Sequence, residues 1–521
     1  MNYIKRWAAM LLSLVMALSL LSGCGAQKTL SLTAVLTGIP ATLDPAMVTS
    51  DAEKTVVSHL YENLMKLWPN TEGGVSAIPA AAKANHVVSE SDGTETYTFT
   101  LRSDLTWSDG QSVTAADFVY AWQRLVDPKT ASPNASLLDM VAGYAAARAG
   151  DVSKLQVSAP DDTTFQVVLS HPCPYFLSAV CTAAATMPVR EDITLTNGAY
   201  RIAEQTDDAL IAVAAEDYYD SKRIGPAELR FSFCETSDDA AARCQQGDWD
   251  VVLGLTEAQG DDAVVDTSPE VGVLLVNQMT VNVASEPLRQ AMSLVIDRNA
   301  VATLLGNNTQ AADGLIPTGI ANTCGEDFRT AAEAAIDNVP EDYEKNCQTA
   351  REKLSTAKLE PAKLGAITLY HENTPEQMKL AQLLQSTWQE QLGLTVKVVE
   401  LPQADLQRAL QKGEFALALT TIRCDRSDPT GYLDIWRSGG SENYANFHSS
   451  AYDLLLRVSD ASQSPEARDA YLEDAEHLLL DTGNVMPLYF TTRFHRMNNG
   501  LSGLFDDGLG TYYLSALRTG A

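Results

Sequence analysis

The sequence predicts an α/β protein built from several domains, and two observations carry this prediction. After VGVLLVN, apolar residues at helical spacing alternate with strand-like segments. PLRQAMSLVIDRNAVATLL and TPEQMKLAQLLQSTWQEQLG are helix patterns, and the strand LTVKVVEL directly follows the second. This alternation favours parallel pairing of strands. The chain of 521 residues is also long enough for about two to four domains.

The first part of the chain has the pattern of a strand-rich α+β unit that ends near Pro188. LSLTAV is a predicted strand, and VVSHLYENLMKLW is a predicted helix that stops at Pro69. Hairpin turns follow at Asp92-Gly93 and Asp109-Gly110, and TTFQVVLS is the next strand. NGAYRIAEQTDDALIAVAAEDYYD, AELRFSF and DWDVVLGL then predict further strands. Near the C-terminus, two helices, AYDLLLRVSD and PEARDAYLEDAEHLLLDT, precede the strand VMPLYFTT.

The stretch LTWSDGQSVTAADFVYAWQRLVDP contains a complete set of folding signals. Thr114 is well placed to cap a helix, and Asp117 completes a short variant of the capping box. Val113 and Phe118 have the spacing of a hydrophobic staple, and Phe118 continues an apolar stripe through Trp122. The stretch is therefore predicted to be scaffold rather than a chemical site.

The N-terminal segment has the layout of a secretory signal. Lys5 and Arg6 precede an apolar run over residues 7–21, which is too short for a membrane-spanning helix. LSGC at 21–24 resembles the lipobox that bacterial lipoprotein signal peptidases cleave. Residues 1–23 are thus a predicted signal peptide, and Cys24 is predicted to carry a lipid on a tether of residues 24–29. The alternative is an ordinary signal peptide with a chance cysteine.

Composition and motifs narrow the possible functions. The net charge of −30 disfavours binding to nucleic acid or to an anionic membrane surface. The sequence has no G-x-S-x-G elbow, phosphate-binding loop, dinucleotide-binding glycine motif or H-E-x-x-H. We therefore expect no catalytic residue, no metal and no cofactor.

Seven cysteines follow Cys24 in the sequence, and an exported chain permits disulfides. Neighbouring cysteines suggest the pairs 173/181, 234/244 and 324/347, which would leave Cys424 single. No pair has the C-x-x-C spacing of a zinc site.

The Leu105–Pro128 stretch and its continuation VDPKTASPNAS resemble the signature of the substrate-binding proteins of peptide ABC importers, the oligopeptide- and dipeptide-binding family. Further landmarks occur in the family's order: ATLDPA, TNGAYRI, PLRQAMSLVIDR, GLIPTG, DRSDP, NYANFHSSAYDLLL and VMPLYF. The resemblance implies a two-lobed, three-domain fold of the periplasmic-binding-protein type, with mixed sheets and a hinge between the lobes. Domain I would comprise residues 30–70, 188–275 and 497–521, domain II residues 71–187, and domain III residues 276–496. The chain would cross between lobes near 275–281 and 493–498.

The same resemblance implies a set of ligand-binding residues. Asp425 in DRSDP would bind the α-ammonium of a peptide, although it also fits a turn residue before Asp428-Pro429. The remaining candidates are backbone partners or side chains at family positions: Thr421, Ile422, Arg423, Thr49, Ser50, Asp51, Asn443, Asn134 and Tyr489. Asn134 replaces a tyrosine found in relatives. Gln377, Leu410 and Leu419 stand where some relatives have basic or imidazole side chains, so the ligand's carboxylate has no obvious partner.

These observations predict a monomeric, lipid-anchored protein that captures extracellular oligopeptides between its lobes. It would deliver them to an ABC permease and its ATPase subunits in the bacterial cell membrane. Two alternatives remain open. One is the same role for another cargo, such as a nickel chelate, haem or an oligosaccharide, and the other is an extracytoplasmic hydrolase or surface sensor.

Overall fold

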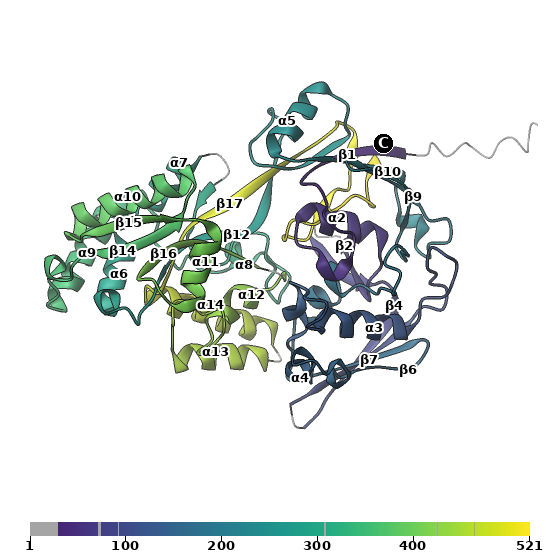
Figure 1. Ribbon diagram of the computed structural model, residues 1–521, viewed down its shortest axis with the longest axis horizontal. Coiled ribbons are helices and arrows are strands. Elements are labelled where there is room, and N and C mark those ends of the chain that lie inside the picture. Colours follow the sequence, from purple (N-terminus) through teal and green to yellow (C-terminus); the bar gives the residue numbers. More distant parts are fainter. Residues whose placement is uncertain are drawn as a thin grey trace, which may run out of the picture.

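The computed structural model describes residues 30–70, 74–91, 93–306, 309–424, 426–462 and 464–520. The chain forms two lobes joined by two long strands (Figure 1). The signal peptide, Cys24, Asp92 and Asp425 lie outside the described residues. No helix in the described ranges is long and apolar enough to cross a membrane.

The first lobe contains two strand systems. In one, β1 (Leu30–Thr37) lies between β10 (Pro226–Cys234) and β11 (Val251–Leu255), parallel to both. On the outer side of β10 follow β9 (Ala209–Ala214) and β8 (Tyr200–Gln205), both in antiparallel pairing. The second system is a four-stranded antiparallel sheet with the order β4 (Ala82–Ser89), β5 (Glu95–Leu101), β7 (Thr164–Leu169) and β6 (Val157–Asp161).

Helix α3 (Ala115–Val126) covers the four-stranded sheet and confirms the prediction for the Leu105–Pro128 stretch. The Asp117 carboxylate accepts hydrogen bonds from the backbone N–H of Thr114 at 2.7 Å and from Trp107 Nε1 at 3.3 Å. Trp107, Phe118 and Trp122 are completely buried. Because each prominent residue caps, turns or packs, this stretch is scaffold.

The second lobe contains three parallel strands that are covered by helices on both faces. Strands β14 (Ile367–Glu372), β15 (Val396–Leu401) and β16 (Leu417–Arg423) pair in parallel. Leu380, Leu384 and Trp388 repeat every four residues along α10 (Pro375–Leu392) and pack on one face. The other face meets α11 (Gln403–Lys412), α13 (Ser450–Asp460) and α14 (Pro465–Asp481). Helices α6 (Glu286–Leu294), α7 (Arg298–Leu305) and α9 (Tyr343–Thr356) lie on the α10 side.

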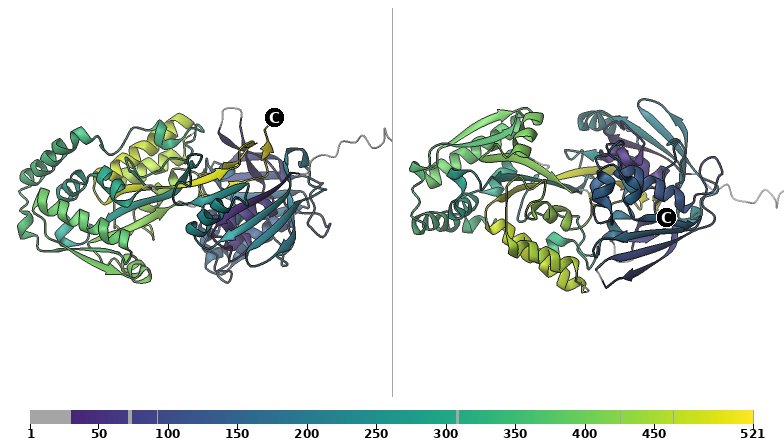
Figure 2. Two further views of the ribbon diagram at one scale, coloured as in Figure 1. Left: turned by 90° about the horizontal axis from the view of Figure 1, so that it is seen from above. Right: turned by 60° about the horizontal axis from the view of Figure 1, so that its bottom comes forward.

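Strands β12 (Val264–Val276) and β17 (Val485–Met497) join the lobes as an antiparallel pair. They unite both lobes in a mixed sheet of 11 strands within the described ranges, and Figure 2 shows β17 running from one lobe into the other. Their register is interrupted between Thr267 and Val271. From Val271 onward, β12 packs in the second lobe's cores, so the strand itself forms the connection. The domain limits given above stay a prediction.

The predicted helix up to Pro69 was wrong at its C-terminal end. Helix α2 (Asp51–Leu60) ends where Tyr61 adopts an extended conformation, and Met65–Pro69 is strand β2. β2 pairs with β3 (Val75–Pro79), a partner that helical spacing of apolar residues cannot reveal.

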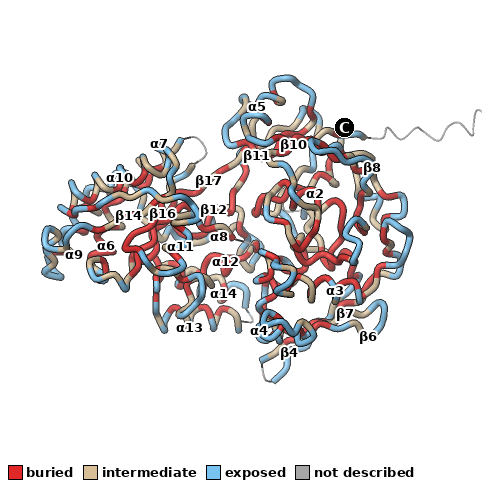
Figure 3. The backbone as a smooth tube through the Cα atoms, viewed as in Figure 1, coloured by how far each residue is buried: buried red, intermediate tan, exposed pale blue. Residues whose placement is uncertain are grey.

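The predicted cysteine pairs are wrong as well. Cys173, Cys181, Cys234, Cys244, Cys324 and Cys347 are free thiols, and five of these six are buried. Cys347 lies in the core of the second lobe, whereas Cys324 is exposed beside the Asp469 carboxylate. The other four sit in hydrophobic clusters, where cysteine acts as a small apolar side chain. Figure 3 shows the buried backbone in the interior of both lobes.

Candidate ligand-binding cleft

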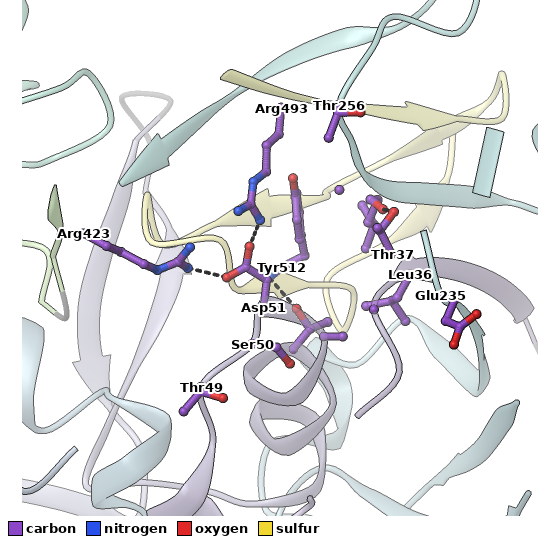
Figure 4. Close-up of a pocket in the computed structure, with 15 residues that line it drawn as sticks. Leu36, Thr37, Thr49, Ser50, Asp51, Glu235, Thr256, Arg423, Arg493 and Tyr512 are labelled. Atoms are coloured by element: carbon purple, nitrogen blue, oxygen red, sulfur yellow. Dashed lines mark hydrogen bonds and ion pairs between the residues drawn. The ribbon is translucent and has the colours of Figure 1, made fainter. Parts of the chain in front are cut away.

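Two cavities lie where the lobes face each other. The smaller, of about 350 Å³, is lined by the N-terminal turn of α2 and the ends of β1 and β11 in the first lobe. Arg423 of β16 and Arg493 of β17 reach it from the opposite side (Figure 4). The larger, of about 620 Å³, lies between residues 319–327 of the second lobe and segments 174–178 and 506–508 of the first.

A capping box fixes the start of α2 at the smaller cavity. The Ser50 hydroxyl accepts a hydrogen bond from the backbone N–H of Glu53 at 3.2 Å. The Glu53 carboxylate accepts the backbone N–H groups of Ala41, Thr49 and Ser50 at 2.7–3.0 Å. Burial alone would raise the pKa of Glu53, but these hydrogen bonds outweigh it and hold the pKa below its ordinary value. Thr49 and Ser50 are therefore held in place before any ligand arrives.

Asp51, the first residue of α2, is the centre of an ion cluster across the lobes. Arg423 forms an ion pair with Asp51 Oδ1, and Arg493 forms one with Oδ2 (Figure 4). The Oε1 atom of Glu270, on β12, lies 2.8 Å from Arg423 Nη1 and 3.6 Å from Arg493 Nη2. Burial lowers the pKa of Arg493, the expected cost for a cation removed from water. The four charges offset one another.

Strand β16 presents an edge that no described strand covers along its C-terminal half. Its neighbour β14 pairs only with Leu417 and Ala418, whereas β12 on the other side pairs along the full length to Arg423. Thr421 is exposed and Ile422 is buried. Unpaired backbone at a sheet edge can accept one more extended chain.

Five acidic side chains are among the residues that line the larger cavity. They are Glu326, Asp327, Asp428, Asp506 and Asp507. Arg468 also lines it, and its Nη2 lies 2.9 Å from Asp428 Oδ1. Burial and neighbouring carboxylates raise the pKa of Asp506 to about 6.

Glycines permit a close contact between the lobes at this cavity. Gly319 and Gly508 both have positive φ angles, and a Cβ atom on Gly508 would lie 2.1 Å from the Gly319 carbonyl oxygen. A larger residue at 508 would push the lobes apart.

The structure brings some of the predicted site residues together and separates others. Thr49, Ser50, Asp51 and Arg423 meet at the smaller cavity. Asn134, Asn443 and Tyr489 line neither cavity.

These three residues have structural contacts instead. Asn134 Nδ2 donates to the Val48 carbonyl at 2.8 Å, which fixes the segment before α2. Asn443 Nδ2 donates to the Phe447 carbonyl at 2.8 Å and closes a loop. The buried Tyr489 hydroxyl accepts from Gln377 Nε2 at 3.3 Å.

Sequence reasoning missed Arg493 and Glu270. Each stands in a strand pattern among residues that pack the sheet, and neither belongs to a motif. Their shared contacts depend on the pairing of β12 with β17, which no local signal gives.

The model for bacterial extracellular solute-binding proteins, family 5 Middle, matches residues 76–444. The chain belongs to this family. Its members are binding proteins rather than enzymes, which removes the hydrolase alternative. The predicted α/β fold with mixed sheets is confirmed by its likeness to solved structures.

Three similar proteins illustrate the range of the family. The chain is 26% identical over 488 residues to the dipeptide-binding protein DppE of Bacillus subtilis. The alignment covers 89% of this chain and 87% of DppE. It is 27% identical over 481 residues to the probable deoxycholate-binding periplasmic protein YgiS of Escherichia coli, covering 87% and 86%. The unliganded open form of MppA, a periplasmic murein tripeptide-binding protein, has a TM-score of 0.79 at 25% identity and covers 94% and 98%.

Proposed function

We propose that this protein binds peptides between its lobes and delivers them to an ABC-type permease with its ATPase subunits. The observation that carries the proposal is the uncovered edge of β16 beside the interlobe cavities. Peptides of varied sequence share their backbone amides, and an added strand at this edge would satisfy those amides whatever the side chains. The names of DppE and MppA support the same ligand class.

The terminal ammonium of the peptide needs a paired anion once it leaves water. Asp425 stands two residues after the end of β16 in the sequence, and we assign it this role. Thr49 to Asp51 and Thr421 to Arg423 would supply the flanking contacts, as expected from their place at the smaller cavity or on the β16 edge. Asn134 would act indirectly, because it holds the segment before α2.

We assign the membrane attachment to Cys24, whose thioether would carry the lipid, with the protein acting as a monomer. Incorporation of labelled palmitate tests this directly. Cys24→Ser should abolish labelling, whereas Cys324→Ser, which removes an exposed thiol, should leave it intact. Equal labelling of both variants contradicts the assignment.

The cargo is tested by native mass spectrometry of the purified protein, followed by titration calorimetry with alanine tripeptide and with deoxycholate. The name of YgiS makes a steroid carboxylate the second candidate. Peptide masses that co-purify, together with saturable tripeptide binding, support the proposal. Binding of deoxycholate without any binding of peptides refutes it.

A further inference from the structure

Asp51 occupies a position in which two guanidinium groups grip one carboxylate. Arg423 contacts one of its oxygens and Arg493 the other. Charge-assisted contacts of a carboxylate with a guanidinium are stronger than hydrogen bonds between neutral groups. Asp51 belongs to the first lobe, whereas Arg423 comes from the second lobe and Arg493 from the connecting strand β17.

The partners of Asp51 stand on three neighbouring strands. Arg423 and Glu270 face each other in the register of β16 and β12, and Arg493 stands on β17, which pairs with β12. Glu270 is the second carboxylate that both arginines contact. Without Asp51, this trio has two positive charges against one negative charge.

A change in the angle between the lobes moves Asp51 relative to the trio, because α2 does not belong to the three strands. The trio then has a net positive charge and a vacant carboxylate position at the cleft. The side chains of Arg423 and Arg493 are 29% and 24% exposed, so a ligand group can reach them.

The β16 edge sets where a ligand would meet this charge. A chain added along Thr421 and Ile422 runs toward Arg423, the last residue of the strand. Main-chain pairing and a carboxylate contact are therefore available within one short ligand.

We propose that Arg423 and Arg493 form a carboxylate subsite for the bound peptide, at the position that the Asp51 carboxylate occupies in this structure. This inference rests on the proposed peptide-binding function. The subsite would give a ligand carboxylate a positively charged partner. Positions 377, 410 and 419 offer none, because Leu410 and Leu419 lie in the cores and Gln377 contacts Tyr489.

The carboxylate can come from an acidic side chain of a peptide whose ammonium lies at Asp425. It can also come from the C-terminus of a peptide that runs in the opposite direction, which would contradict the assignment of Asp425. Two pairs of probes separate these sources: Ala-Ala-Ala against its C-terminal amide, and Ala-Glu-Ala against Ala-Gln-Ala. Calorimetry gives the affinity ratio within each pair. We expect the wild-type protein to prefer the carboxylate by about tenfold in at least one pair, a value at the low end for charge pairs because the guanidiniums are partly exposed.

Variants test the residues. Arg423→Gln should bring that ratio close to one, and Asp51→Asn should raise it several-fold, because the internal competitor loses its charge. Arg496→Gln is the matched control: it also removes an arginine from an aspartate, Asp262 at 2.8 Å, but on β17 and outside the cavity. It should keep the wild-type ratio.

The outcomes distinguish a failure of the proposed subsite from a failure of the proposed peptide-binding function. Failure of the wild-type protein to bind any of the four probes refutes the peptide-binding function. Binding with equal ratios in wild type and Arg423→Gln refutes the subsite alone. Weaker binding of all probes by Asp51→Asn, with the ratio unchanged, also overturns the subsite and assigns Asp51 to the ammonium end.

Discussion

The buried ring of His59 makes the free energy of unfolding dependent on pH. Its ring is buried in the first lobe, with Nδ1 2.7 Å from the Thr55 carbonyl and Nε2 3.0 Å from the backbone nitrogen of Leu514. Because the Leu514 N–H donates, Nε2 must be the acceptor and Nδ1 carries the proton. The neutral ring therefore ties α2 to the C-terminal segment.

Protonation places a hydrogen on Nε2, where it faces the Leu514 N–H, and puts a positive charge on a buried ring. Burial accordingly lowers the pKa of His59 from 6.5 to about 4. The histidine of the unfolded chain takes up its proton near pH 6.5, so the stabilisation is fully present above that pH. It is lost as the pH falls through the folded-state value. A shift of this size corresponds to about 3 kcal/mol of unfolding free energy.

Urea unfolding followed by tryptophan fluorescence at about pH 7 and pH 4.5 measures this term. Between these two pH values, the free energy of unfolding of the wild-type protein should fall by about 2–3 kcal/mol more than that of His59→Gln. His86→Gln, which removes an exposed histidine from the same lobe, should follow the wild type. Parallel loss in wild type and His59→Gln would refute the reasoning.

Three further predictions concern the cleft. Asp506→Asn should stabilise the protein by about 1–2 kcal/mol at pH 7. Burial raises the pKa of Asp506 to about 6, so the charged carboxylate present at pH 7 is penalised in the folded protein. Urea titrations should show that this gain shrinks toward pH 4. Gly508→Ala should weaken tripeptide binding by about tenfold, through the clash with Gly319, whereas Gly500→Ala, with a similar positive φ and open space, should not. Asp425→Ala should cost about 2–5 kcal/mol of peptide affinity by calorimetry, and unchanged affinity contradicts its assignment to the ammonium.

The sequence was sufficient where local signals determine structure. The Thr114 capping box and the apolar stripe through Trp122 required only residues a few positions apart, and the structure confirms both. The C-terminal end of α2 was mispredicted because β2 takes its conformation from pairing with β3. An apolar run whose spacing fits both a helix and a strand does not show which of the two it forms, because the outcome depends on the strand it pairs with.

For the site, too, the position of single residues could be predicted, but contacts between distant segments could not. The resemblance placed Asp51 and Arg423 among the ligand contacts, and the structure puts both at the smaller cavity. It could not show that they contact each other, because that contact joins residues far apart in the sequence and from different lobes. The resemblance predicts a ligand contact for Tyr489, yet its ring packs against Gly272 of the neighbouring strand, where an added Cβ would lie 2.2 Å away.

The ion cluster is both the proposed contact for a ligand carboxylate and a contact between the two lobes. A ligand shifts a conformational equilibrium only by as much as its contacts differ between the two states. A carboxylate bound far from the joint would add affinity without favouring one lobe angle. Arg423 and Asp51 face each other from different lobes, while Glu270 and Arg493 stand on the strands that join them. A ligand group that replaces Asp51 therefore breaks a contact between the lobes as it forms its own, so binding and lobe angle are coupled through the same four charges.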